Sequence, residues 1–267
     1  MTEWRLERLD APQLQGLSTG EAHRRALHVH GTWGNFYENV IATDTSAPYA
    51  EHGFGFATVN TAGHDAGSIT EDLNSATDEI GAWMRHFEQQ GTEEWILQGH
   101  SLGALKLMRQ LLDGGADSRI RGVVLLSPFD LPAFYAQSGD QGQIDSQIAA
   151  VEAFAEDQGR EATVPTEIFD IWPVSAGTMI AALQSGGPLD VFQSRTGTLS
   201  HIRELQLPAL VLLGGADFAA TPNARDVAEQ VSKAGVEVRL IEDAPHNFGG
   251  YEDQVNGAIS EFLSREL

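Results

Sequence analysis

Residues 95–112 read WILQGHSLGALKLMRQLL and give the strongest indication of the fold. WILQ is a short apolar run typical of a buried strand, and the residues from Leu102 onward repeat apolar side chains at helical spacing. Between them, GHSLG matches the pattern G-x-S-x-G at a sharp strand-to-helix turn. Glycines keep Cβ atoms out of such a turn, and the helix N-terminus favours negative charge beside the serine. Ser101 is therefore predicted to be a nucleophile.

Working outward, the same alternation of strand and helix continues along the chain. Apolar runs predict strands over 26–30, 54–60, 95–98, 122–127, 209–213 and 236–241. Apolar positions three and four apart predict helices over 71–90, 102–112, 222–234 and 250–267. Residues 4–20 are interpreted as an edge strand or hairpin. The pattern predicts an α/β chain with a mostly parallel central sheet flanked by helices.

One long segment interrupts this alternation. Residues 129–200 hold helical pieces and many aromatic side chains but no convincing strand. A connection of about 70 residues is far longer than an ordinary loop. We therefore expect a helical cap at 129–200 inserted into a core formed by 1–128 and 201–267. The simpler alternative is two crossover helices joined by long loops.

Composition excludes several classes of protein. The chain has 267 residues, a formal charge of −22 and no cysteine. Disulfide scaffolds, thiolate metal sites and cysteine nucleophiles are thereby excluded, and the charge disfavours nucleic acid as a partner. No apolar stretch reaches the roughly 20 residues of a membrane span, and the N-terminus does not look like a signal peptide. A cytoplasmic location without membrane partners is expected.

A serine nucleophile requires a base and an acid that orients it. His246 follows the last predicted strand, so it should lie at the same edge of the sheet as Ser101. Asp217 follows the preceding strand and is the expected acid, with Asp130 as the alternative. The order Ser101, Asp217, His246 is that of the α/β-hydrolase layout.

The remaining catalytic element would be a pair of backbone amides that bind an oxyanion. The amide of Leu102, directly after Ser101, is one expected donor. The second is expected from the glycine-rich loop HGTWGNF at 30–36, where Thr32 is preferred and Trp33 is the alternative. A turn without any such role is the structural alternative.

Five motifs in order resemble the α/β-hydrolase superfamily: HGTWGNF at 30–36, NTAGHDAG at 60–67, GHSLG at 99–103, GGAD at 214–217 and PHNF at 245–248. The resemblance covers about residues 1–127 and 201–267, and it implies a lid between the fourth and fifth central strands. NTAGHDAG resembles a turn that often reads R-G-H-G-x-S, with Asn60 in place of the arginine and Asp65 in place of the second glycine. His64 is accordingly expected to be structural.

Together these features predict a serine hydrolase that cleaves a carboxylic ester of a moderately apolar small molecule through an acyl-enzyme, without a metal or other cofactor. The expected substrate-contacting side chains are Trp33, His100 and Trp172. A thioesterase, an amidase, a C–C bond hydrolase and a perhydrolase remain alternatives on the same triad. A non-catalytic ligand-binding member of the fold is the alternative from another class. A small-molecule substrate is the expected partner, and a homodimer is the alternative to a monomer.

Overall fold

The structure is a computed structural model of the chain. It describes residues 3–10, 12–37, 40–71, 73–114, 117–130, 133–134, 141–168, 173–183, 192, 206–220 and 222–267.

The centre of the molecule is an eight-stranded sheet in the order β1-β2-β4-β3-β5-β6-β7-β8. Its strands are β1 (Arg5–Asp10), β2 (Gln13–Thr19), β3 (Arg24–Val29), β4 (Gly55–Val59), β5 (Glu94–His100), β6 (Ile120–Leu126), β7 (Ala209–Gly214) and β8 (Glu237–Ile241). The hairpin β1–β2 is antiparallel and pairs with β4 in the antiparallel sense, and all other pairs are parallel. The predicted mostly parallel α/β sheet and the hairpin at its edge are therefore confirmed.

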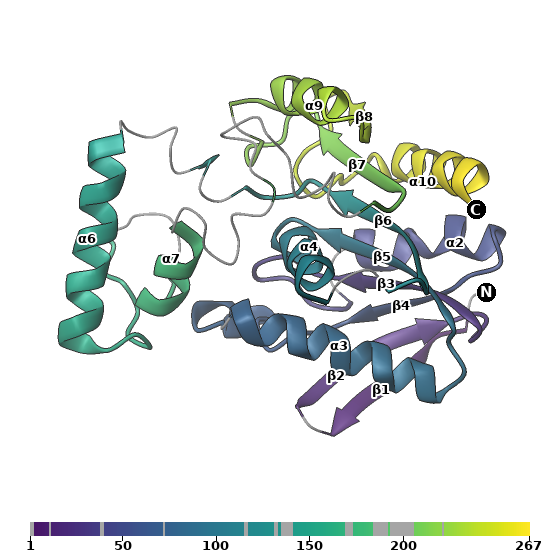
Figure 1. Cartoon of the computed structure of the whole chain (residues 1–267), viewed down its shortest axis with the longest axis horizontal. Coiled ribbons are helices and arrows are strands. Elements are labelled where there is room, and N and C mark those ends of the chain that lie inside the picture. Colours follow the sequence, from purple (N-terminus) through teal and green to yellow (C-terminus); the bar gives the residue numbers. More distant parts are fainter. Residues whose placement is uncertain are drawn as a thin grey trace.

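Helices cover both faces of the sheet (Figure 1). They are α1 (Val40–Asp44), α2 (Ser46–Glu51), α3 (Leu73–Gln89), α4 (Leu102–Gly114), α6 (Gln141–Gln158), α7 (Ala176–Leu183), α9 (Ala224–Lys233) and α10 (Glu252–Glu266), with a 3-10 helix, η1, at Asp65–Ile69. The core on one face joins α3, α4 and α9, whereas the core on the other joins α2 and α10. Alternate residues of each central strand feed the two cores, because neighbouring side chains of a strand point to opposite faces.

Two of the described helices lie between β6 and β7. In Figure 1, α6 and α7 lie against each other at one side of the sheet, beyond the ends of α3 and α4. The start of α7 is joined to the loop after β4, since the Ser175 amide donates to the Ile69 carbonyl over 2.5 Å. The division into a core and a cap at 129–200 stays a prediction.

Candidate active site

Ser101 lies at the tight turn between β5 and α4. Its φ of +55° is in the left-handed region that non-glycine residues rarely adopt. Glycine is required on both sides of Ser101. A Cβ on Gly99 would lie 2.6 Å from the Gly103 carbonyl oxygen, and a Cβ on Gly103 would overlap the carbonyl oxygen of Val29. The close approach of β3, β5 and α4 thus explains both glycines of the motif.

A continuous hydrogen-bonded chain starts at Ser101. Its Oγ lies 2.9 Å from Nε2 of His246, whose Nδ1 lies 2.8 Å from Oδ1 of Asp217. Because an ionised carboxylate only accepts hydrogen bonds, Nδ1 carries the ring proton and Nε2 accepts from the serine hydroxyl. The carboxylate is 1 % exposed and the imidazole 15 %, so the contact is shielded from water. The structure thus brings together the three residues that the sequence selected as nucleophile, base and acid.

The alternative acid, Asp130, has a different place. Its Oδ1 accepts from the Ala133 amide over 3.1 Å at the start of the segment after β6. Asp217 instead follows β7 in the loop beside His246, and its Oδ1 also accepts from the Ala219 amide over 2.8 Å. The geometry therefore favours Asp217 over Asp130 as the orienting carboxylate.

The loop after β3, residues 30–37, approaches Ser101 from the neighbouring strand. A Cβ on Gly31 would lie 2.7 Å from the Cβ and 3.2 Å from the Oγ of Ser101. The Trp33 amide donates to Ser68 Oγ over 2.8 Å and is therefore engaged elsewhere. Within the described residues, the Thr32 amide makes no hydrogen bond, and Leu102 begins α4, where backbone amides have no partner inside the helix. These observations favour Thr32 and Leu102 over Trp33 as oxyanion donors.

Three histidines near the carboxyl ends of β3 and β5 are buried: His28, His30 and His100. Burial, and next the neighbouring His246, lower the pKa of His100 to about 4. Burial likewise lowers the pKa of His28 to about 3 and that of His30 well below its ordinary value. All three are therefore neutral at pH 7.

Of the predicted substrate-contacting residues, His100 is 5 % exposed, and its Nε2 donates to the His246 carbonyl over 2.9 Å. This position favours support of the His246 loop over direct contact with a ligand. Trp33 is 41 % exposed and available to a ligand. Trp172 lies outside the described residues.

An aromatic cluster lies beside His246. Phe129 and Phe134 are among the aromatic residues of the segment expected to form a cap, whereas Phe218 was missed by sequence reasoning. The ring of Phe218 lies 4.9 Å from the imidazole, and that of Phe129 lies 6.0 Å from it. Phe134 completes the cluster at 5.1 Å from Phe129. Phe218 is 63 % exposed, so much of its ring is available to a ligand. Its position directly after Asp217 was the only signal in the sequence.

Two features are absent from the described residues. No group of three or more His, Cys, Asp or Glu side chains in them is arranged to hold a metal ion. No described helix is long and apolar enough to cross a membrane.

Solved structures share this architecture over almost the whole chain. Est1E from Butyrivibrio proteoclasticus with bound ferulic acid has a TM-score of 0.65 at 15 % identity, over 99 % of this chain and 95 % of Est1E. A monoacylglycerol lipase of Paleococcus ferrophilus has a TM-score of 0.63 at 16 % identity, over 95 % and 99 % of the two chains. The Pyrococcus furiosus esterase Pf2001 has a TM-score of 0.57 at 15 % identity, over 100 % and 91 %. Identities this low establish a common fold and nothing finer.

Sequence comparison identifies the family. No curated protein sequence matches the chain. The sequence model of the alpha/beta hydrolase family matches residues 26–258, which include every residue of the hydrogen-bonded chain and the loop beside it. The chain belongs to the alpha/beta hydrolase family.

Proposed function

We propose that the protein is a serine hydrolase that cleaves a carboxylic ester of a moderately apolar small molecule through an acyl-enzyme at Ser101. The observation that carries this proposal is the chain Ser101–His246–Asp217, with contacts of 2.9 and 2.8 Å. A hydroxyl is a weak nucleophile unless an adjacent base takes its proton, and here the base is oriented by a carboxylate that is itself buried.

In the first half-reaction, Ser101 Oγ attacks the ester carbonyl carbon while His246 Nε2 accepts the hydroxyl proton. The carbonyl oxygen becomes an oxyanion bound by the amides of Thr32 and Leu102, and Asp217 stabilises the imidazolium. Collapse of this intermediate breaks the bond to the alcohol, which leaves with the proton from His246. Water then attacks the acyl-enzyme by the same steps, releasing the carboxylic acid and restoring Ser101.

The aromatic cluster of Phe129, Phe134 and Phe218 supports an apolar substrate. The rings of Phe218 and Phe129 lie 4.9 and 6.0 Å from the imidazole, so an acyl or alcohol group bound beside the base would contact the exposed ring of Phe218. Exposed apolar side chains beside a reactive group are typical of ligand sites. The helices α6 and α7 would belong to a cap over this site. The charge of −22 disfavours strongly anionic substrates such as coenzyme A thioesters.

The test is hydrolysis of p-nitrophenyl esters of increasing acyl length, together with methyl ferulate, a methyl ester with an aromatic acyl group. Wild type should turn over these esters, and Ser101→Ala should lose at least about 10³-fold in kcat/KM. The matched control is Ser264→Ala, an exposed serine on α10, which should keep full activity.

Labelling by a fluorophosphonate adds an independent readout of the nucleophile. Wild type should be labelled, and Ser101→Ala should not. Labelling without ester hydrolysis would shift the proposal to a thioester, an amide or a C–C bond. A folded protein with neither labelling nor hydrolysis would favour the non-catalytic alternative.

A further inference from the structure

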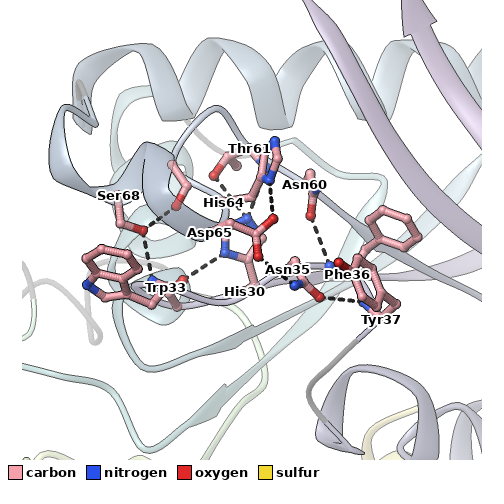
Figure 2. A network of polar contacts seen from close by, with 12 residues as sticks. His30, Trp33, Asn35, Phe36, Tyr37, Asn60, Thr61, His64, Asp65 and Ser68 are labelled. Carbon is pink, nitrogen blue, oxygen red and sulfur yellow. Dashed lines mark hydrogen bonds and ion pairs between the residues drawn. The ribbon is translucent and has the colours of Figure 1, made fainter.

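The β3 loop, residues 30–37, is bound along its length by the segment that follows β4, residues 60–71, which we call the supporting segment. Figure 2 shows these contacts, which come from both backbone and side chains. They are Thr61 N to His30 Nε2 at 3.1 Å, Trp33 N to Ser68 Oγ at 2.8 Å, Asp65 N to Gly34 O at 3.1 Å, Asn35 Nδ2 to Asp65 Oδ1 at 2.8 Å, and Phe36 N to Asn60 Oδ1 at 2.9 Å. The supporting segment is therefore a template for the loop that approaches Ser101.

One turn inside the β3 loop is strained. The Gly34 amide donates to the Gly31 carbonyl over 3.2 Å, which closes a β-turn over residues 31–34. Its third residue, Trp33, has a φ of +59°, whereas Thr32 is not among the residues with positive φ. A negative φ followed by a positive φ is the order found in type II turns, whose third position normally requires glycine. A tryptophan there is strained, so holding the positive φ requires a restraint.

Ser68 supplies that restraint. Its hydroxyl donates to the Gly63 carbonyl, which leaves the oxygen lone pairs free to accept from the Trp33 amide. This acceptance holds the Trp33 amide, and with it the turn with positive φ, in place. Ser68 is 4 % exposed, so water cannot readily take the place of its hydroxyl.

The acceptor is itself held firmly, because η1 and the residues after it are anchored to two helices. Lys106 on α4 forms an ion pair with Glu71 at 2.5 Å, and their side chains are 0 % and 2 % exposed. Thr178 Oγ1 on α7 donates to the Glu71 carbonyl over 2.7 Å. Ser68 thus lies on a braced element and can hold the strained turn without moving toward it.

We propose that Ser68 is a positioning residue for the oxyanion site. By accepting the Trp33 amide, Ser68 keeps the 31–34 turn in its strained form and the peptide between Gly31 and Thr32 against Ser101. This hydrogen bond also occupies the Trp33 amide, so the Thr32 amide is the one in the β3 loop that can donate to the oxyanion. The inference rests on the proposed function, since its readout is hydrolysis that depends on Ser101.

The variant Ser68→Ala tests the proposal in the full chain. Without the hydroxyl, the turn relaxes and shifts the Thr32 amide by a fraction of an ångström, which weakens the transition state more than the bound substrate. We expect kcat for a p-nitrophenyl ester to fall by about tenfold and KM to change by less than about twofold. The inhibition constant of a trifluoromethyl ketone, which forms an oxyanion adduct, should rise by the same factor as kcat falls.

Two further variants separate positioning from simple stability. Ser68→Thr retains the hydroxyl and should restore most of kcat, which also covers the case in which Ser68→Ala folds poorly. In a Trp33→Gly background, Ser68→Ala should cost less in kcat, because glycine adopts the left-handed conformation without strain. The matched control is Ser18→Ala, a fully buried serine on β2 that donates to Glu7 over 2.5 Å and should change stability but not kcat.

The outcomes distinguish this inference from the proposed function. If wild type shows no hydrolysis that depends on Ser101, the proposed function fails, and the role of Ser68 fails with it. If wild type is active and folded Ser68→Ala keeps its kcat, only the role of Ser68 is rejected. An equal fall of kcat in Ser18→Ala, or a change confined to KM in Ser68→Ala, would also reject it.

Discussion

The closest approach between the β3 loop and the nucleophile makes Gly31→Ala a sharp test of the proposed oxyanion site. A Cβ at this position would lie 2.7 Å from Ser101 Cβ, 3.0 Å from the His100 carbonyl oxygen and 3.2 Å from Ser101 Oγ. Non-bonded carbon atoms normally stay at least about 3.5 Å apart. The new methyl group must therefore push the loop away from Ser101 by roughly 0.8 Å.

That displacement can be converted into a rate. The Thr32 amide follows Gly31 directly, so it moves with the loop and away from the developing oxyanion. A misplacement of about 1 Å costs on the order of 10²-fold, and complete loss of one oxyanion donor costs about 10²–10³-fold. We expect kcat/KM of Gly31→Ala to fall by about 10²-fold, with the loss mainly in kcat.

The assay is steady-state hydrolysis of a p-nitrophenyl ester, with circular dichroism to verify folding. The matched control is Gly257→Ala on α10, where a Cβ would meet nothing within 4 Å. That control should retain full activity and gain roughly 0.5–1 kcal/mol of stability from helix propensity. A folded Gly31→Ala enzyme with wild-type kcat would refute the reasoning, since the second donor could not then lie in the β3 loop.

Three further predictions concern the substrate, the core and pH. Phe218→Ala should raise KM for p-nitrophenyl esters of long-chain acids and for methyl ferulate by roughly fivefold but leave KM for p-nitrophenyl acetate unchanged, because only the larger acyl groups reach the exposed ring. Equal effects on all esters would argue against a contact. Lys106→Met should lower the free energy of unfolding by about 3–5 kcal/mol, because it leaves the buried Glu71 carboxylate unpaired. Adding Glu71→Gln should recover part of that loss, and urea unfolding measures both variants. The three buried histidines have folded-state pKa values below 6.5, about 4 for His100 and about 3 for His28. The unfolded chain therefore binds protons that the folded chain does not as pH falls below about 6.5. Stability should drop by about 2 kcal/mol for each of His28 and His100 between pH 7 and pH 5, and His30 should act in the same direction. Urea unfolding at pH 7 and pH 5 should show this loss of stability in the wild type and a smaller loss in His28→Gln. Equal wild-type stability at the two pH values would contradict the prediction.

Local pattern was enough to predict the parallel sheet. The central strands are buried on both faces, so each appears as a continuous apolar run such as Val123–Leu126, and a helix with a regular apolar repeat follows most of them. The short helices α1 and α2 and the 3-10 helix η1 were not predicted. Elements of five or six residues are too short for a helical repeat to be recognised.

The Ser101–His246–Asp217 chain could also be anticipated, because strand order and direction impose its geometry. Parallel strands place all their carboxyl ends at one edge of the sheet, so residues directly after β5, β7 and β8 have to meet there. The GHSLG motif adds a local requirement, since only glycine fits on both sides of the turn at Ser101. Which carboxylate reaches His246 depended on distances that sequence spacing does not contain.

The alternation of strand and helix, and the set of residues that could meet at one edge of the sheet, follow from the sequence alone. Which of these residues meet depends on how the strands and loops pack, and the packing brings Asp217 to His246 and the Trp33 amide to Ser68. It also places Phe218 on His246 and pairs Lys106 with Glu71 inside the core. The physical reason is that hydrophobic periodicity is a property of neighbours along the chain. Hydrogen bonds and ion pairs between loops instead join residues far apart in the chain, and their geometry exists only once the strands have packed side by side.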